Sequence, residues 1–205
     1  MARKKDRKPR KFYSSGRVKR GAAPLVRITK DKYRRALPEL RRDFEDRCAY
    51  CMRHICTETE MQVDHFDPRR KKDKLQVYSN LFLSDAHCNG AKSDSWPTDA
   101  EIKDGIRFIN CCEEQDYGEQ IFEDPNTHEL VGTTLAAIYH IDTIDLNDPG
   151  LVNERRYRYE LFAKLDYLAE GELTPDMKQV VDSLRDELKR CIPRIPPPEN
   201  YWSVE

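Results

Sequence analysis

The chain has 205 residues, of which 36% are charged and 9% are aromatic, as is typical of one domain with a modest core and a heavily solvated surface. The first residues are polar and no long apolar run follows, so we expect a cytoplasmic protein without a signal peptide or a membrane segment. The formal net charge of -1 conceals a division, because residues 1–100 hold 25 Lys and Arg against 14 Asp and Glu, whereas residues 101–205 hold 11 against 23. The first half could bind a polyanion, and the second could not easily do so.

Residues 1–22 are basic and lack an apolar period, which predicts a disordered tail that precedes a single domain over residues 23–205. Residues 28–47 carry spaced apolar positions among charges and predict a helix that is interrupted at Pro38. A compact stretch over residues 46–97 follows, and it holds the residues with defined chemistry.

The segment CAYC places Cys48 and Cys51 on a tight turn. Seven cysteines in a chain without a secretion signal argue against disulfides. Two thiolates at this spacing supply half of a tetrahedral zinc site. Cys88 and Asp85 stand three residues apart downstream, and on a helix these positions share a face. We therefore expect structural Zn²⁺ bound by Cys48, Cys51, Cys88 and Asp85.

The fourth zinc ligand has alternatives. His87 is chemically a better zinc ligand than Asp85, but it adjoins Cys88 and would point elsewhere on a helix. Other thiols are further candidates, although such residues are more often simply buried; they are Cys56, Cys111 and Cys112.

Between the zinc half-sites, residues 61–66 and 76–84 predict two strands, the second led by a turn at Ser79 and Asn80, and residues 85–94 predict a helix. The segments CAYC, VDHFDP, NLFLSDAHCN and NGAKSD, in this order, resemble the HNH nuclease family over roughly residues 46–97. The resemblance implies an α+β protein in which a zinc-supported ββα-metal core lies within a mostly helical domain.

The resemblance also implies roles for four residues, and these fit the chemistry of phosphodiester hydrolysis. His65 is the expected general base, because imidazole titrates close to neutral pH. Asp64 and Asn89 offer the oxygen ligands that Mg²⁺, or Mn²⁺, prefers. Asn80 is expected to hold the loop that carries His65. Reading His65 as a hydrogen-bonded core histidine remains the simple alternative.

Basic residues follow the Asp64-His65 pair and lie in the loop between the two strands, where a nucleic acid would pass. Lys92 comes one helical turn after Asn89 and is expected to face the phosphates, although a solvated lysine is the alternative. The expected nucleic-acid contacts are Arg69, Arg70, Lys71, Lys72 and Lys92.

Beyond the motif, residues 98–205 predict a largely helical part. The pattern indicates a helix that runs into a turn over residues 99–114, a hairpin over 119–135, and helices over 151–170 and 174–192. Thr174 is the expected N-cap of the last helix.

Segments of this C-terminal part resemble stand-alone HNH proteins of bacterial antiphage defence systems, such as the Septu, retron-associated and Zorya types. The resulting prediction is a metal-dependent HNH endonuclease that nicks or fully cleaves DNA, with an ATPase or another defence protein as partner. Two rivals stay open: a catalytically idle zinc module that binds nucleic acid or recruits a partner, and a nuclease directed at RNA.

Overall fold

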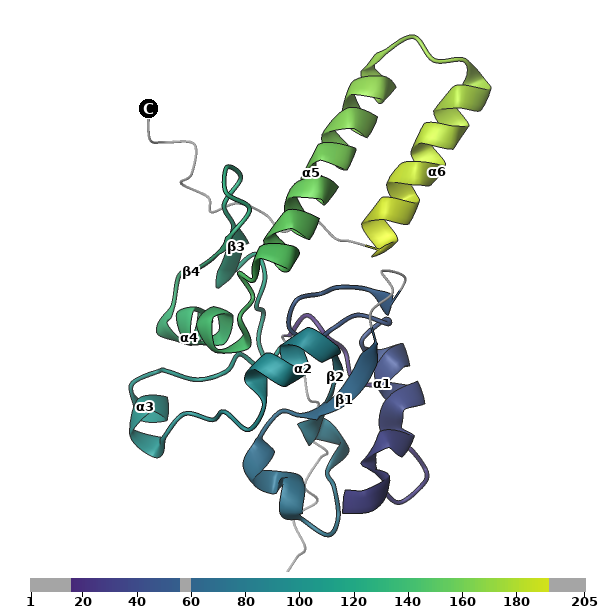
Figure 1. Ribbon diagram of the computed structural model, residues 1–205. Helices are drawn as coiled ribbons and strands as arrows, with labels where there is room; N and C mark the ends of the chain where they lie inside the picture. Colours follow the sequence, from purple (N-terminus) through teal and green to yellow (C-terminus); the bar gives the residue numbers. More distant parts are fainter. Residues whose placement is uncertain (1–15, 56–59, 192–205) are drawn as a thin grey trace, which may run out of the picture.

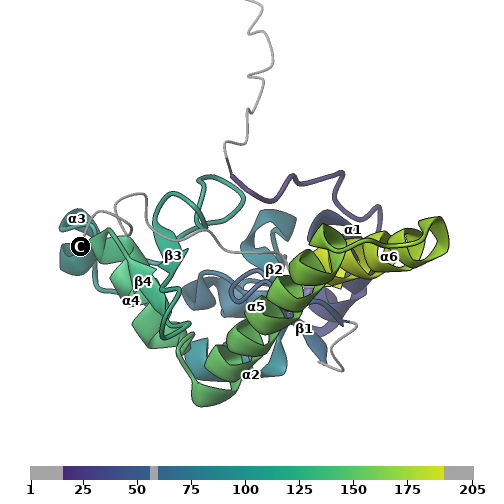
Figure 2. The same ribbon diagram turned by 90° about the horizontal axis from the view of Figure 1, so that it is seen from above.

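Two small antiparallel sheets organise the chain, and helices pack around them (Figures 1 and 2). The computed structural model describes residues 16–55 and 60–191. In one sheet β1 (Met61–His65) pairs with β2 (Leu81–Asp85), and in the other β3 (Ile121–Glu123) pairs with β4 (Leu130–Gly132). This mixed architecture confirms the predicted α+β class.

The first sheet runs directly into a helix and forms the strand–strand–helix unit of the motif. The register pairs Met61 with Asp85 at one end of the hairpin and His65 with Leu81 at the other. α2 (Ala86–Lys92) begins where β2 ends. The second strand is shorter than predicted, because residues before Leu81 form a 3-10 turn, η4 (Tyr78–Asn80).

The predicted first helix divides into a 3-10 segment, η1 (Lys30–Ala36), and an α-helix, α1 (Leu37–Asp43). Pro38 lies in the first turn of α1, where its missing N–H has no intrahelical partner to lose. The helix ends at a turn in which Glu45 and Asp46 have positive φ.

The C-terminal part follows the predicted order, with one helix that the sequence pattern did not reveal. α3 (Asp99–Lys103) is a short helix with a capping box, and β3 and β4 form the predicted hairpin. α4 (Leu135–Ile144) was not predicted; Thr134 caps it. α5 (Pro149–Glu170) and α6 (Pro175–Cys191) lie side by side and extend away from the body (Figures 1 and 2).

A buried polar network fixes the base of α5 to the second hairpin. Arg158 donates to Glu123 at 2.5 Å, and Arg155 donates to the carbonyl oxygen of His128 at 2.6 Å. The His128 ring also contacts Glu123, with 2.9 Å between Nδ1 and Oε1. Charged groups that are buried in this way are paired, because an unpaired charge would lose its hydration without compensation. These two arginines therefore have a structural role.

Aromatic side chains join the motif core to the C-terminal part. The Phe66 ring stacks on Phe82 with 4.7 Å between ring centroids and contacts Trp96 edge-on at 5.5 Å. Phe108 continues the cluster toward α4, where it contacts Tyr139 at 5.0 Å. Such ring pairs contribute about 0.5–1.5 kcal/mol each beyond the burial of their area. The C-terminal part is thus packed directly on the ββα unit.

The structure describes only part of the predicted basic tail, residues 1–22. Residues 1–15 lie outside the described residues. Residues 16–22, also expected in the tail, instead lie against the domain: Arg17 forms an ion pair with Asp116 at 2.8 Å, Val18 is buried, and Arg20 donates to the carbonyl oxygen of Leu81 at 2.6 Å. Within the part of the chain that the structure describes, no helix has the length and apolar character needed to cross a bilayer.

Candidate active site

The first half of the predicted zinc site is a knuckle, in which the chain turns sharply around two cysteines. The Cys48 N–H donates to the carbonyl oxygen of Arg53 at 2.8 Å, and Met52 closes the turn with φ 61°. The knuckle is held on the sheet because the Ala49 N–H donates to the carbonyl oxygen of Leu83 in β2 at 2.7 Å. Both thiols consequently face the end of the hairpin where β2 meets α2.

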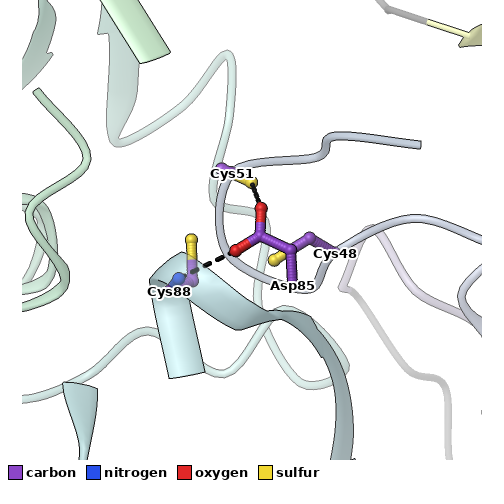
Figure 3. Close-up of side chains that lie close together, drawn as sticks. All are labelled: Cys48, Cys51, Asp85 and Cys88. Carbon is purple, nitrogen blue, oxygen red and sulfur yellow. Dashed lines mark hydrogen bonds between the residues drawn. The ribbon is translucent and has the colours of Figure 1, made fainter. Parts of the chain in front are cut away.

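The second half of the site lies at that junction. Asp85 is the N-cap of α2, and its Oδ1 accepts from the Cys88 N–H at 2.8 Å while its Oδ2 accepts from the Cys51 thiol at 3.0 Å (Figure 3). The ligand atoms of Cys48, Cys51, Asp85 and Cys88 all lie within 4.8 Å of one another. In a tetrahedral zinc site with Zn–S bonds near 2.3 Å, neighbouring sulfurs are about 3.7 Å apart. The four side chains therefore form a cluster that is compatible with zinc.

The electrostatics of this cluster also suit a cation. Burial acts to raise the pKa of the Cys48 thiol, but hydrogen bonds from Cys51 and Cys88 outweigh burial and lower it. Burial raises the pKa of Cys88, and burial together with Cys48 raises that of Cys51. One thiolate is thus stabilised by the two remaining thiols, and a metal ion that replaced their protons would satisfy all three sulfurs.

The alternative fourth ligands lie elsewhere or outside the described residues. His87 points from α2 toward the carbonyl oxygen of Asp145, at 3.1 Å from Nε2. Cys112 contacts Arg20, with 3.3 Å between Sγ and Nε, and is not part of the cluster; nor is Cys111. Cys56 lies outside the described residues. Asp85 is the residue that completes the group of three cysteines.

The opposite end of the hairpin holds the predicted catalytic pair. Asp64 is 2% exposed, and its Oδ2 accepts from the Tyr50 hydroxyl at 2.5 Å and lies 3.0 Å from the Lys92 Nζ. Neither contact involves Oδ1. Burial and the Asp64 charge raise the pKa of Tyr50 well above its usual value, so the hydroxyl keeps its proton and donates. Asp64 is thus a buried carboxylate held by two donors.

Lys92 has a different environment from the one predicted. We expected it to face the phosphates, but its side chain is fully buried between Asp64 and the carbonyl oxygen of His65, to which Nζ donates at 2.9 Å. The reason is helical position: Lys92 follows Asn89 by three residues, so both lie on the face of α2 that covers β1. In this conformation Lys92 supports the site from inside and does not reach solvent.

His65 lies on the other face of β1, because successive strand residues point to opposite sides. Its Nε2 is 2.8 Å from the side-chain oxygen of Gln76. The Gln76 amide nitrogen in turn donates to the carbonyl oxygen of Asp73 at 2.6 Å, which turns the Gln76 oxygen toward His65. An amide oxygen only accepts, so Nε2 carries the proton and Nδ1 is left as the nitrogen able to take one. Burial lowers the pKa of His65, although Gln76 and Asp64 oppose this shift.

The two asparagines lie in different elements: Asn80 ends η4 directly before β2, and Asn89 lies within α2. Asn80 exchanges two hydrogen bonds with the backbone of Asp67, accepting from its N–H at 2.9 Å and donating to its carbonyl oxygen at 3.1 Å. The Asn89 amide nitrogen donates to the side-chain oxygen of Gln62 at 2.7 Å. Gln62 and Asp64 stand two residues apart on β1 and so share a face of the strand. Asn89 and Asp64 therefore both lie where α2 packs on β1, although they are not bonded to each other.

The predicted nucleic-acid loop carries its basic residues on a 3-10 turn, η3 (Pro68–Lys72). Most of them already have acidic neighbours: Arg69 pairs with Asp67 at 2.9 Å, Arg70 with Asp73 at 3.5 Å, and Lys71 with Asp94. The Arg69 guanidinium also lies 5.1 Å above the Trp96 ring. Lys72 is exposed. These contacts reduce the net charge that the loop offers to a phosphate backbone.

Sequence reasoning missed the residues that hold the site together. Tyr50 stands inside the CAYC knuckle and links it to Asp64, whereas Gln76 and Gln62 orient His65 and Asn89. The sequence did contain a signal for Tyr50, since a tyrosine between two ligand cysteines must lie close to the core. Nothing in the sequence singles out either glutamine, because their roles depend on which residues meet across the fold.

Comparison with known families agrees with this geometry. Residues 48–95 match the family model described as HNH endonuclease. No curated protein and no solved structure matches the chain. The matched segment spans the knuckle, both strands of the first sheet and α2, so this part of the chain is an HNH endonuclease domain.

Proposed function

We propose that the protein is a metal-dependent endonuclease that hydrolyses phosphodiester bonds in DNA. The observation that carries the proposal is the pair of adjacent residues at the end of β1: a histidine with one ring nitrogen fixed by Gln76, and beside it the buried carboxylate of Asp64. Together with the HNH match over residues 48–95, this pairing supports nuclease chemistry over a purely structural role.

In the proposed reaction His65 is the general base. Its Nδ1 would accept a proton from the attacking water, and the bond from Nε2 to Gln76 would hold the ring in the tautomer that leaves Nδ1 free. Burial keeps the imidazole neutral at physiological pH, as a base requires. Asn80 would maintain the distance between β1 and the loop through its two bonds to Asp67.

The oxygen ligands for a catalytic ion would come from Asp64 and Asn89. The bond from the Asn89 nitrogen to Gln62 leaves the amide oxygen to face away from Gln62, and Oδ1 of Asp64 takes no part in the contacts with Tyr50 and Lys92. Both are hard oxygen donors of the kind that Mg²⁺ or Mn²⁺ prefers. A bound divalent ion would stabilise the charge that develops on the phosphate and on the leaving oxygen.

We assign a structural Zn²⁺ to the cysteine cluster, with Asp85 as the fourth ligand. The cluster offers four ligands from the chain itself and would leave no position open for substrate, as is usual for structural zinc. The strand to be cut would pass over the loop of Arg69, Arg70, Lys71 and Lys72. We do not propose a phosphate contact for Lys92, because its side chain is buried.

Substrate class is the first test of this proposal. The purified protein would be incubated with DNA and RNA duplexes of matched sequence, in Mg²⁺ or with the Mg²⁺ omitted. We expect cleavage of the DNA duplex in the presence of Mg²⁺ alone. Cleavage of RNA in preference to DNA would reassign the substrate, and binding of DNA without cleavage in any divalent ion would favour an idle nucleic-acid-binding module.

We further propose that this nuclease is the effector of a bacterial antiphage system, with an ATPase or another defence protein as partner. This finer proposal rests on the resemblance of the C-terminal part alone. Phage plating on bacterial cells that express the wild-type protein or His65→Ala would test it. Equal plating on both strains would remove the defence role and leave the nuclease proposal intact.

A further inference from the structure

A cavity of about 440 Å³ lies where residues 17–21 pass beside the end of α1 and the entrance to the knuckle. None of its lining residues is a predicted zinc ligand or a predicted catalytic residue. Two carboxylates line it, Asp43 and Glu45. The cationic side chains are more numerous, and they are Arg17, Lys19, Arg20, Arg42 and Arg47.

Two of these arginines form ion pairs with acids at or near the cavity. Arg42 lies 2.8 Å from Asp43, whose other oxygen accepts from the Tyr78 hydroxyl, also at 2.8 Å. Arg17 lies 2.8 Å from Asp116 and donates to the carbonyl oxygen of Ala49. With these two pairs set aside, the lining still holds Lys19, Arg20 and Arg47 against the single carboxylate of Glu45, which is an excess of positive charge.

Arg20 is the cation whose hydrogen bonding is incomplete. Its Nη2 donates to the carbonyl oxygen of Leu81, its Nε contacts the Cys112 sulfur, and its guanidinium carbon lies 4.8 Å from the centroid of the Phe44 ring. Its Nη1 is buried and has no hydrogen-bond partner among the described residues. Within the same residues Arg20 forms no ion pair. The guanidinium carbon also lies 5.0 Å from the centroids of the Tyr78 and Phe82 rings. Arg20 therefore contributes positive charge beneath the cavity but does not present Nη1 to a ligand in it.

The shape and chemistry of the cavity select the class of ligand. Guanidinium groups present a planar fork of N–H donors that matches the oxygens of a phosphate. The volume falls within the range of about 300–1,000 Å³ that small-ligand sites occupy. Phe44 and Met52 add apolar lining beside the cations, so a sugar or base attached to the phosphate could also be accommodated.

We propose that this cavity is a second phosphate site, in which the exposed Lys19 and Arg42 bind the phosphate at the rim and the charge of Arg20 attracts it from beneath. For a nuclease, the phosphate bound here would belong to the sugar–phosphate backbone of the bound strand, at a position away from the bond that is cut. In this form the inference rests on the proposed function. A free nucleotide carries the same chemistry, and the experiment separates the two sources.

The test uses the full-length His65→Ala protein, so that DNA is bound without being cut. A double variant, Lys19→Gln with Arg42→Gln, removes two rim cations, and Lys103→Gln with Lys164→Gln is the matched control, since both of those lysines are exposed on α3 and α5. The affinity for a labelled DNA duplex is measured over a series of salt concentrations. Each phosphate contact on duplex DNA contributes about 0.9 to the slope of log K against log salt.

For a DNA phosphate we expect the rim variant to lower this slope by about 1–2 relative to the control pair. For a free nucleotide we expect unchanged slopes but calorimetric binding of a deoxynucleoside monophosphate that the rim variant loses and the control keeps. Equal slopes together with equal or absent nucleotide binding would overturn the proposal. The experiment measures binding and not cleavage, so its result can be interpreted even if the protein proves not to be a nuclease.

Discussion

The two ends of the β1–β2 hairpin hold polar clusters of opposite design. At the end where Met61 pairs with Asp85, three thiols and a carboxylate converge on one point, and every donor comes from the chain. At the end where His65 pairs with Leu81, one buried carboxylate is held by Tyr50 and Lys92, and the histidine beside it faces the other way. The closed cluster suits a permanent ion, whereas in the proposed reaction the other end would leave coordination positions for water and substrate.

Tyr50 connects the two ends. It belongs to the knuckle, and its hydroxyl reaches Asp64 at 2.5 Å across the sheet. Its ring lies 5.7 Å from that of His140 in α4, so the C-terminal part supports the same contact. Disorder in the cysteine cluster should therefore displace Tyr50 and weaken its contact with Asp64. Disorder around Asp64 should have a smaller effect on the cysteine cluster.

The largest expected effect comes from breaking the closed cluster. Cys48→Ser should abolish zinc binding and leave the ββα unit unfolded, because structural zinc contributes about 10–16 kcal/mol of apparent binding free energy to small domains. Zinc content by elemental analysis and thermal unfolding would measure this. Cys112→Ser is the control and should retain the metal. Asp85→Cys should also retain it, whereas zinc retention by Cys48→Ser would contradict the assignment.

Lys92→Met tests the other end. It leaves the Asp64 carboxylate buried without its cation, and breaking a buried pair on one side costs about 3–5 kcal/mol of unfolding free energy. Added Mg²⁺ or Mn²⁺ should recover part of this loss if Asp64 is a metal ligand, because the ion would replace the ammonium charge. Denaturant unfolding with and without the ion gives the comparison, with exposed Lys103→Met as control. If the unfolding free energy falls no further than in the control, Lys92 does not support Asp64.

The support that α4 gives to Tyr50 should depend on pH. Burial lowers the pKa of His140 from 6.5 to about 4, and its Nδ1 accepts from the Ile109 N–H at 3.1 Å, which requires a neutral ring. The unfolded chain therefore binds the proton first, so His140 contributes stability above pH 6.5 and that contribution is lost as the pH falls toward 4. The loss is on the order of 3 kcal/mol.

Unfolding free energy measured between pH 7 and pH 4.5 checks this dependence. His140→Gln keeps an acceptor for the Ile109 N–H without titrating, so the variant should show a shallower decline than wild type. Identical pH profiles for the two proteins would mean that other groups, the zinc ligands included, account for the whole decline.

The smallest effect concerns the orientation of His65. Gln76→Leu removes the acceptor at Nε2, and a hydrogen bond of about 1–1.5 kcal/mol corresponds to a rate loss of about tenfold. Because Gln76 does not touch substrate in the proposed reaction, kcat should fall while KM stays unchanged. Steady-state nicking kinetics would test this, with exposed Gln179→Leu as control. A change in KM alone would place Gln76 in substrate binding instead.

The local patterns of the sequence were enough to predict the ββα unit and the members of the cysteine cluster. Ligand spacing is a local property, and Asp85 and Cys88 stand one helical turn apart whatever surrounds them. The hairpin over β3 and β4 was also predictable from its turn. α4 was missed because its apolar residues are nearly continuous and show little helical period.

Contacts between distant segments could not be predicted in this way. The burial of Lys92 depends on α2 lying across β1, and the role of Gln76 depends on a loop that returns to His65. Arg17 and Arg20 resemble an exposed basic tail in sequence, yet their partners Asp116 and Leu81 are far along the chain. Composition reports the charge of such a segment but not the surface on which it lies.

The most direct measurement of the central claim is cleavage of supercoiled plasmid DNA by wild type, His65→Ala and His87→Ala in Mg²⁺, scored for nicked and linear forms. His87 is a half-buried histidine on α2 that lies outside both clusters, with its ring against the Asp145 carbonyl oxygen, and it serves as the matched control. We expect wild type and His87→Ala to nick at the same rate and His65→Ala to be slower by about 10²–10⁴-fold. Equal rates for all three proteins would contradict the assignment of His65 as the base and with it the proposed active site.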